Sequence, residues 1–182
     1  LAPTFAEAHV NLGSAQQALG KLDAAVRSFR RAIALRPDMA VAHYNLGNVL
    51  RLQGKDRDAV GCYLLALKFA PDHVDAHNNF GDLQLALGKT EPAIASFRRA
   101  LALDPNHADA RINLGNALQE QGEFEQAIAC YREAIARQPE SPVAHNNLGN
   151  ALVAQGKLQE ALESYRRAVA LKNDYLQAHL NL

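Results

Sequence analysis

Apolar residues in the segment 108–141 recur every three or four positions, in two separate stretches. This spacing places them on one face of an α-helix, so each stretch predicts an amphipathic helix. The apolar positions are Ala110, Leu114, Ala117 and Leu118 in the first stretch, and Ala127, Ile128, Tyr131, Ala134 and Ile135 in the second. The segment is therefore predicted to form a hairpin of two helices.

The same pattern returns along the whole chain with a period of 34 residues. Its clearest marker is the stretch 42–47, which reads Ala-His-Tyr-Asn-Leu-Gly, and related stretches begin at Ala8, Ala76, Ala110, Ala144 and Ala178. A fixed period of this length is typical of stacked helical hairpins. We therefore predict one array over residues 1–182. Its full units are 6–39, 40–73, 74–107, 108–141 and 142–175, with 1–5 as the tail of a preceding unit and 176–182 as the start of another.

Two recurring residue types mark the ends of the predicted helices. A glycine stands between the two helices of each unit, where a positive φ would end the first helix. A proline follows the second helix of most units and pushes the residue before it out of helical conformation. The glycines are Gly20, Gly54, Gly88, Gly122 and Gly156, and the prolines are Pro37, Pro71, Pro105 and Pro139.

A second glycine recurs inside the first helix of each unit, where it should cost about 1 kcal/mol relative to alanine. It stands at positions 13, 47, 81, 115 and 149. Recurrence at that cost predicts a close approach between the helices at these points.

These residues resemble the tetratricopeptide repeat family. The family pattern expects small residues where Gly47, Ala59 and Ala66 stand, an aromatic residue at Tyr63 and a proline at Pro71. The resemblance covers essentially the whole chain. It implies an all-α fold, a right-handed superhelical solenoid of antiparallel helix hairpins, in which the first helices line the concave face and the second helices the convex face.

The sequence departs from the family pattern in two places. The aromatic residue expected early in each first helix is replaced by His9, His43, His77 and His145, and by Arg111 in the fourth unit. We expect these histidines to pack as amphipathic rings. Asn173 replaces the closing proline of the last unit, which predicts a softer helix boundary there.

Composition narrows the classes of partner. Lys plus Arg number 19 and Asp plus Glu also number 19, so no long-range field favours nucleic acid or an anionic membrane. No apolar run approaches the roughly 20 residues of a membrane span, and the N-terminus lacks the pattern of a signal peptide. We therefore expect a cytoplasmic protein that binds neither nucleic acid nor membrane. The chain begins at Leu1 inside a repeat and resembles a piece of a longer protein.

Metal, cofactor and catalytic sites are not expected. Equivalent histidines in successive repeats would lie on the order of 10 Å apart, by helix packing distances, whereas zinc ligands lie near ~2 Å from the metal. Cys62 and Cys130 are separated by a whole hairpin, beyond disulfide reach. The stretch Gly88-Lys89-Thr90 resembles the end of a phosphate-binding loop, but that motif needs glycine where Leu83 stands. No nucleophile, base and orienting group recur together, so we predict a non-enzyme.

The candidate site is a row of polar side chains on the first helices. A carboxamide donates to a peptide carbonyl and accepts from a peptide N–H at once. A repeat advance of roughly 10 Å matches about three residues of extended chain, so such a row would hold a peptide backbone. The alternative, equally weighted, is that these amides only bond to neighbouring backbone. The predicted peptide-binding residues are Asn11, Asn45, Asn79, Asn113 and Asn147, which we call the asparagine ladder, together with Asn48, Asp82, Asn116 and Asn150 three residues on.

Two further resemblances bear on the partner. A long array with an asparagine ladder is similar to the substrate-recruiting arm of the O-linked N-acetylglucosamine transferases. By contrast, the chaperone cofactors that grip C-terminal carboxylates use Lys and Arg in the groove. This chain has Val10, Tyr44, Asn78, Ile112 and Asn146 at one such position, so an acidic chaperone tail is a poor candidate.

We therefore predict a scaffold that binds extended peptide segments in the concave groove, as the recognition arm of a larger enzyme such as a glycosyltransferase. The alternative is an assembly module that stacks on copies of itself. Native arrays end in a helix with a polar outer face, whereas this chain stops at Leu182, a few residues into a first helix. End-to-end self-association through uncapped termini is therefore expected.

Overall fold

A computed structural model describes residues 4–174 and 176–181 of the chain. Of the predicted end segments, residues 1–3 and Leu182 lie outside the described residues, as does Tyr175. The described residues form helices and no strand, which confirms the predicted all-α solenoid of repeated hairpins. The helices are α1 (Thr4–Ala18), α2 (Leu22–Leu35), α3 (Ala40–Leu52), α4 (Asp56–Phe69), α5 (Val74–Ala86), α6 (Thr90–Leu103), α7 (Ala108–Glu120), α8 (Phe124–Arg137), α9 (Pro142–Ala154), α10 (Leu158–Leu171) and α11 (Leu176–Leu180).

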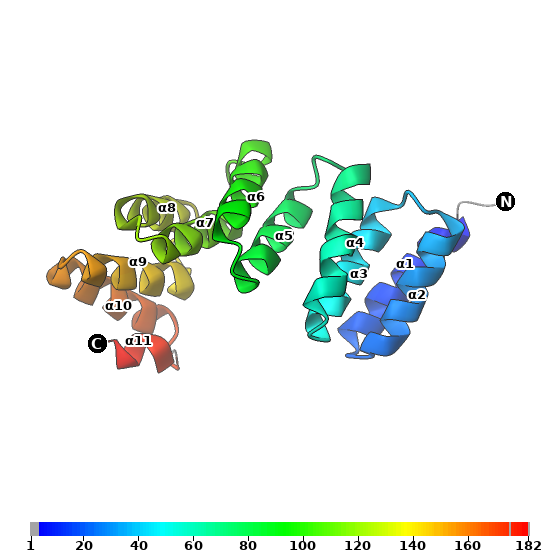
Figure 1. Ribbon diagram of the computed structural model, residues 1–182. Helices are drawn as coiled ribbons and strands as arrows, with labels where there is room; N and C mark the ends of the chain where they lie inside the picture. The colour runs from blue at the N-terminus through cyan, green and yellow to red at the C-terminus, as the bar shows by residue number, and fades with distance from the viewer. Residues whose placement is uncertain (1–3, 175, 182) are drawn as a thin grey trace. The chain divides into compact units, whose positions relative to one another are not determined.

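The chain divides into two compact units, which are described separately. The first unit is Leu1–Leu83 and the second is Gln84–Leu182, so the division falls inside α5. In the first unit, α1 packs on α2, α2 on α3, and α3 on α4. In the second, α7 packs on α8, α8 on α9, and α9 on α10 (Figure 1). The first helices α3, α7 and α9 are thus each packed against the helix before them as well as against the second helix of their own hairpin.

Glycine ends each first helix, as predicted. The φ angle of Gly54 is 71° and that of Gly122 is 80°, in the left-handed region that favours glycine. At the first of these turns, the Gly54 N–H donates to the Arg51 carbonyl at 2.9 Å, and the Lys55 N–H donates to the Leu50 carbonyl at 2.9 Å. These bonds satisfy carbonyls that the end of α3 would otherwise leave without partners.

The second helices end at equivalent positions whether or not a proline follows. Ala70, before Pro71, leaves the helical region with φ −137° and ψ 82°. Lys172, before Asn173, does the same with φ −144° and ψ 96°. The helix boundary in the last repeat is therefore placed without the proline.

The internal glycines make room for an aromatic ring of the second helix. A Cβ built on Gly115 would lie 2.6 Å from the Tyr131 ring, and one built on Gly13 would lie 2.6 Å from the Phe29 ring. Both rings are fully buried. The predicted close approach is confirmed, and its cause is an aromatic ring that occupies the space beside the glycine Cα.

The histidines early in the first helices make a hydrogen bond that the sequence did not predict. The Nε2 of His43 lies 2.8 Å from the Pro37 carbonyl, and that of His77 lies 2.9 Å from the Pro71 carbonyl. A carbonyl only accepts, so Nε2 carries the proton and donates. In the fourth repeat Arg111 Nη2 donates to the Pro105 carbonyl at 2.6 Å. These side chains join α3, α5 and α7 to the backbone that follows the preceding helix.

The helices are too short or too polar to cross a bilayer: within the described part of the chain none meets the length and apolarity of a membrane span.

Candidate functional site

The predicted polar residues lie at equivalent positions on the first helices. Asn11 is exposed on α1, whereas Asn45, Asn79, Asn113 and Asn147 are half-buried. The residues three positions on in α3, α5, α7 and α9 are also half-buried, and these are Asn48, Asp82, Asn116 and Asn150. Residues three apart on a helix share a face, so each first helix presents two of these polar groups together.

In the second unit these amides bond to one another across the repeat boundary. Asn147 Nδ2 donates to Asn116 Oδ1 at 2.9 Å. The same oxygen accepts from the hydroxyl of Tyr131 on α8 at 2.8 Å. Asn147 Oδ1 in turn accepts from Nδ2 of the buried Asn146 at 3.3 Å. The Asn116 oxygen therefore uses both of its lone pairs within the protein.

The arrangement recurs one repeat later. Asn181 Nδ2 donates to Asn150 Oδ1 at 3.1 Å and to Asn146 Oδ1 at 3.2 Å. The Tyr165 hydroxyl donates to Asn150 Oδ1 at 2.8 Å. A cleft of about 360 Å³ lies here, lined by Asn146, Asn147, Asn150, Leu180 and Asn181. The structure thus brings two predicted residues, Asn147 and Asn150, into one cleft.

The first unit repeats the network once. Asn79 Nδ2 donates to Asn48 Oδ1 at 3.1 Å and to the Tyr44 hydroxyl at 3.0 Å. The Tyr63 hydroxyl donates to Asn48 Oδ1 at 2.6 Å. Burial raises the pKa of the Tyr63 hydroxyl, and burial likewise raises the pKa of Tyr131. Both hydroxyls therefore stay protonated and able to donate.

A larger cleft of about 550 Å³ opens over this network in the first unit. Asn48, Asn79, Gln17 and Arg51 are among its lining residues. Arg51 Nη2 contacts Asp82 Oδ2 at 2.7 Å. Asp82, which we predicted to bind peptide, thus has its charge balanced within the protein, since its carboxylate pairs with Arg51. Arg51 was not predicted as a site residue, because no other repeat carries a cation at the equivalent position.

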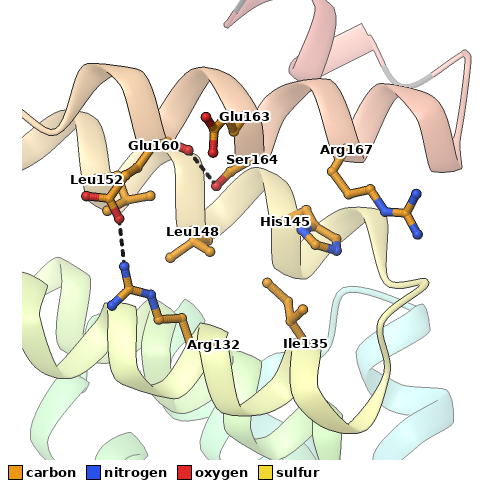
Figure 2. Close-up of a pocket in the computed structure, with 9 residues that line it drawn as sticks. All are labelled: Arg132, Ile135, His145, Leu148, Leu152, Glu160, Glu163, Ser164 and Arg167. Atoms are coloured by element: carbon orange, nitrogen blue, oxygen red, sulfur yellow. Dashed lines mark hydrogen bonds and ion pairs between the residues drawn. The ribbon is translucent and has the colours of Figure 1, made fainter.

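A third cleft lies on the side of the second helices and was not predicted. It has a volume of about 330 Å³ and lies between α8, α9 and α10. Figure 2 shows the Arg132–Glu160 ion pair, 2.8 Å long, at one end and Arg167 at the other, with Leu148 between them. In the preceding repeat Arg111 stands where His145 does here, and it pairs with Glu133. The lining differs from the preceding repeat at further positions, because Gln126, Ala129 and Glu133 stand there in place of Glu160, Glu163 and Arg167.

The described residues include no group of three His, Cys, Asp or Glu side chains placed to hold a metal ion. Cys62 and Cys130 are free thiols, and burial raises the pKa of both. A raised pKa leaves the thiolate scarce at neutral pH, so neither is an activated nucleophile.

Sequence models of known families match most of the chain. Two models described as "Tetratricopeptide repeat" match residues 112–175 and 40–73, and one described as "TPR repeat" matches residues 17–54 and 81–122. The match at 40–73 coincides with the second predicted unit. No curated protein matches the chain by sequence.

Solved structures share the fold at low sequence identity. A structure from the characterisation of pilF from Pseudomonas aeruginosa is 19% identical, with a TM-score of 0.89 over 98% of this chain and 81% of its own. MamA from Desulfovibrio magneticus RS-1 is 22% identical, with a TM-score of 0.84 over 94% of this chain and 97% of its own. YrrB, described as a TPR protein with an unusual peptide-binding site, is 22% identical, with a TM-score of 0.78 over 94% of this chain and 89% of its own.

Proposed function

Because this chain belongs to the tetratricopeptide repeat family, we propose that it binds extended protein segments along the face formed by its first helices. Proteins of this family generally mediate protein–protein interactions. The observation that carries the finer proposal is the pair of polar clefts on the first helices, each lined by asparagine side chains. The description of YrrB as a protein with a peptide-binding site supports it by analogy.

The hydrogen-bonding groups that remain unused on the asparagine side chains match those of a peptide backbone. Asn147 Nδ2 has two protons and donates one hydrogen bond, to Asn116, while its Oδ1 accepts one bond from Asn146. One donor and one acceptor position therefore remain, which is what a peptide group requires. Asn79 differs, since both of its protons are used by Asn48 and Tyr44. The rungs of the ladder are thus unequal, and Asn147 has the larger remaining capacity.

The test replaces Asn45, Asn79, Asn113 and Asn147 together by alanine. The probe is a fluorescent, acetylated and amidated Gly-Ser dodecapeptide, which offers a backbone and almost no side chains. At about 0.5–1.5 kcal/mol per lost hydrogen bond, four rungs should cost at least roughly tenfold in affinity. Fluorescence anisotropy gives the affinity and circular dichroism the melting temperature of the same samples.

The matched control removes two first-helix amides outside the ladder. Gln16 accepts from the Ser28 hydroxyl and Gln84 from the Ser96 hydroxyl, each at 2.7 Å. Gln16→Ala with Gln84→Ala should lower the melting temperature and leave affinity per folded molecule unchanged. If the ladder variant behaves like this control, the ladder is purely structural and the proposal is wrong.

The resemblance to the recruiting arms of O-linked N-acetylglucosamine transferases extends the proposal: the array would present a bound segment to a catalytic domain. None of the three structural relatives named above is described as a glycosyltransferase. This extension therefore rests on the asparagine ladder alone. Glycosylation of a groove-bound peptide by the parent protein would support it, and a parent protein without transferase activity would refute it.

Self-stacking is the second candidate, and exposed apolar side chains favour it. Phe5 and Leu12 on α1 and Leu19, directly after its end, are spaced seven residues apart and are 66%, 48% and 70% exposed. Residues at this spacing lie on one helix face. At the other end, Leu176 and Leu180 are 69% and 76% exposed. Sedimentation velocity over a hundredfold concentration range should detect association. The double variant Phe5→Ser with Leu12→Ser should no longer associate. If the sedimentation coefficient of the unmodified protein does not change with concentration, stacking through α1 is excluded.

A further inference from the structure

The sequence pairs asparagine with tyrosine and not with phenylalanine. Asn48, Asn116 and Asn150 each stand 15 residues before a tyrosine, whose hydroxyl bonds to the asparagine side chain. In the two remaining repeats the second-helix aromatic is Phe29 or Phe97, and the first-helix residue is Ser14 or Asp82. A buried hydroxyl is therefore present only where an amide stands to accept from it. Packing alone does not require this match, since phenylalanine fills the same ring position.

The tyrosine hydroxyl fixes which way the amide faces. Asn116 Oδ1 accepts from the Tyr131 hydroxyl at 2.8 Å and from Asn147 Nδ2 at 2.9 Å. Asn150 Oδ1 accepts from the Tyr165 hydroxyl at 2.8 Å and from Asn181 Nδ2 at 3.1 Å. A carboxamide is planar, so an oxygen held by two donors leaves its Nδ2 directed to the other side. Among residues 4–174 and 176–181, neither of these two Nδ2 groups has a hydrogen-bond acceptor.

The hydroxyl itself cannot move away. Tyr131 is fully buried, and its ring packs so closely on Gly115 that a methyl group there would lie 2.6 Å from it. Tyr165 is 4% exposed and packs in the same way on Gly149. Two hydrogen bonds per oxygen and an immobile ring give each amide a preset orientation, so little side-chain entropy is lost when a ligand binds.

We propose that Tyr131 and Tyr165 are positioning residues, which hold Asn116 and Asn150 so that each Nδ2 donates to a main-chain carbonyl of the bound peptide. This inference rests on the proposed function and specifies it, because it adds to the asparagine ladder two donors that bond to carbonyl oxygens of the ligand. The two asparagines are one repeat apart, and a repeat of roughly 10 Å spans about three residues of extended chain. The ligand is therefore recognised through carbonyls three residues apart, without selection for its side chains.

The orientation is tested first in the free protein. Solvent exchange of the side-chain NH₂ protons is measured by NMR on ¹⁵N-labelled protein. The Asn116 and Asn150 protons should exchange fast, because they have no acceptor, whereas one Asn147 proton should exchange slowly. In Tyr131→Phe this pattern should be lost at Asn116. Slow exchange at Asn116 and Asn150 in the unmodified protein would mean that the amides are turned the other way, and would overturn the inference.

The contribution to binding is tested with the Gly-Ser dodecapeptide used above. Tyr131→Phe with Tyr165→Phe keeps both rings and removes only the hydroxyls, so affinity should fall about threefold to tenfold, the range of one net hydrogen bond. The control, Ser96→Ala, removes a hydroxyl that donates to the first-helix amide of Gln84 at 2.7 Å, away from the cleft. This control should leave affinity unchanged. Equal affinities for the tyrosine variant and the control would refute the positioning role.

A gain of function separates positioning from stability. Ser14→Asn with Phe29→Tyr installs the missing pair in the first repeat, and should raise affinity about twofold to fivefold, while neither single change does. If the unmodified protein does not bind the dodecapeptide, the proposed function fails by itself. The exchange pattern of Asn116 and Asn150 then decides the orientation separately.

Discussion

Replacing Gly115 by alanine should destabilise the array, although alanine is the better helix former. Alanine gains about 1 kcal/mol of helix propensity at an interior position. Its methyl group would, however, lie 2.6 Å from the Tyr131 ring, which is fully buried and bonded through its hydroxyl to Asn116. Overpacking of this kind costs about 1–3 kcal/mol, and displacing the ring also weakens the bond to Asn116, worth roughly 1 kcal/mol. We expect a net loss of about 1–3 kcal/mol.

Two other glycines give a graded comparison. Gly61 lies exposed in α4 with nothing near its missing Cβ, so Gly61→Ala should raise the free energy of unfolding by about 0.5–1 kcal/mol. At Gly47 the methyl group would lie 3.1 Å from the Tyr63 ring, so Gly47→Ala should fall between the other two. Urea unfolding followed by circular dichroism gives the order.

The steric cause has its own control, a double-mutant cycle. Tyr131→Leu removes the ring, so adding Gly115→Ala in that background should cost less than in the unmodified protein. If Gly115→Ala stabilises the protein as much as Gly61→Ala does, the ring does not explain the recurring glycine and the packing argument is refuted.

Three further predictions concern single positions. Leu114→Asp should lower the free energy of unfolding by several kcal/mol, because Leu114 is only 8% exposed. Leu12 is 48% exposed, so Leu12→Asp should mainly fray the first hairpin. Equal losses of helicity in the two variants would contradict this. Burial lowers the pKa of His145, with Arg167 adding to the shift and the bond to the Pro139 carbonyl opposing it. The imidazole of the unfolded chain therefore binds a proton more readily than the folded one, so the free energy of unfolding should fall as the pH drops below about 6.5. The fall should be smaller in His145→Gln. Urea midpoints measured between pH 8 and pH 5 test both expectations. Arg111→His should keep the donor to the Pro105 carbonyl and remove the buried, unpaired Nε. The free energy of unfolding, measured with urea, should therefore stay equal or rise by up to about 1 kcal/mol. A clear loss would show that the ion pair with Glu133 is the stronger effect.

The sequence sufficed for the helices and turns because their causes are local. Gly54 and Gly122 end helices through their own φ angles, and Ala110 and Leu114 follow the helical period within one segment. The internal Gly115 was correctly linked to a close approach, but the sequence did not say what approaches. That required the position of Tyr131 in the packed hairpin.

The candidate site was less accessible to sequence reasoning because it depends on hydrogen-bond direction. The bond from His43 to the Pro37 carbonyl joins residues six positions apart across a helix boundary, where helical periodicity gives no information. The pairing of Asn116 with Tyr131 is visible in the sequence as a match between repeats, yet it is explained only once the hydroxyl is seen 2.8 Å from the amide oxygen. The cleft between α8 and α10 depends on individual side-chain volumes, which no repeat pattern encodes.

The two explanations weighed for the asparagine ladder, ligand binding and architecture, are compatible in this geometry. A carboxamide has two donor protons and two acceptor lone pairs, and the architecture uses only part of them. At Asn116 the internal hydrogen bonds involve the side-chain oxygen and leave the nitrogen without an acceptor. At Asn147 they involve one proton of the nitrogen and one lone pair of the oxygen. A peptide that bonds to the remaining groups of both residues would join α7 to α9, the same two helices that the internal bonds already join. Ligand binding would then stabilise the interface between repeats by mass action, because it requires both helices to be in place. Loss of stability on mutation of Asn147 is thus no argument against binding, and only affinity measured per folded molecule separates the two.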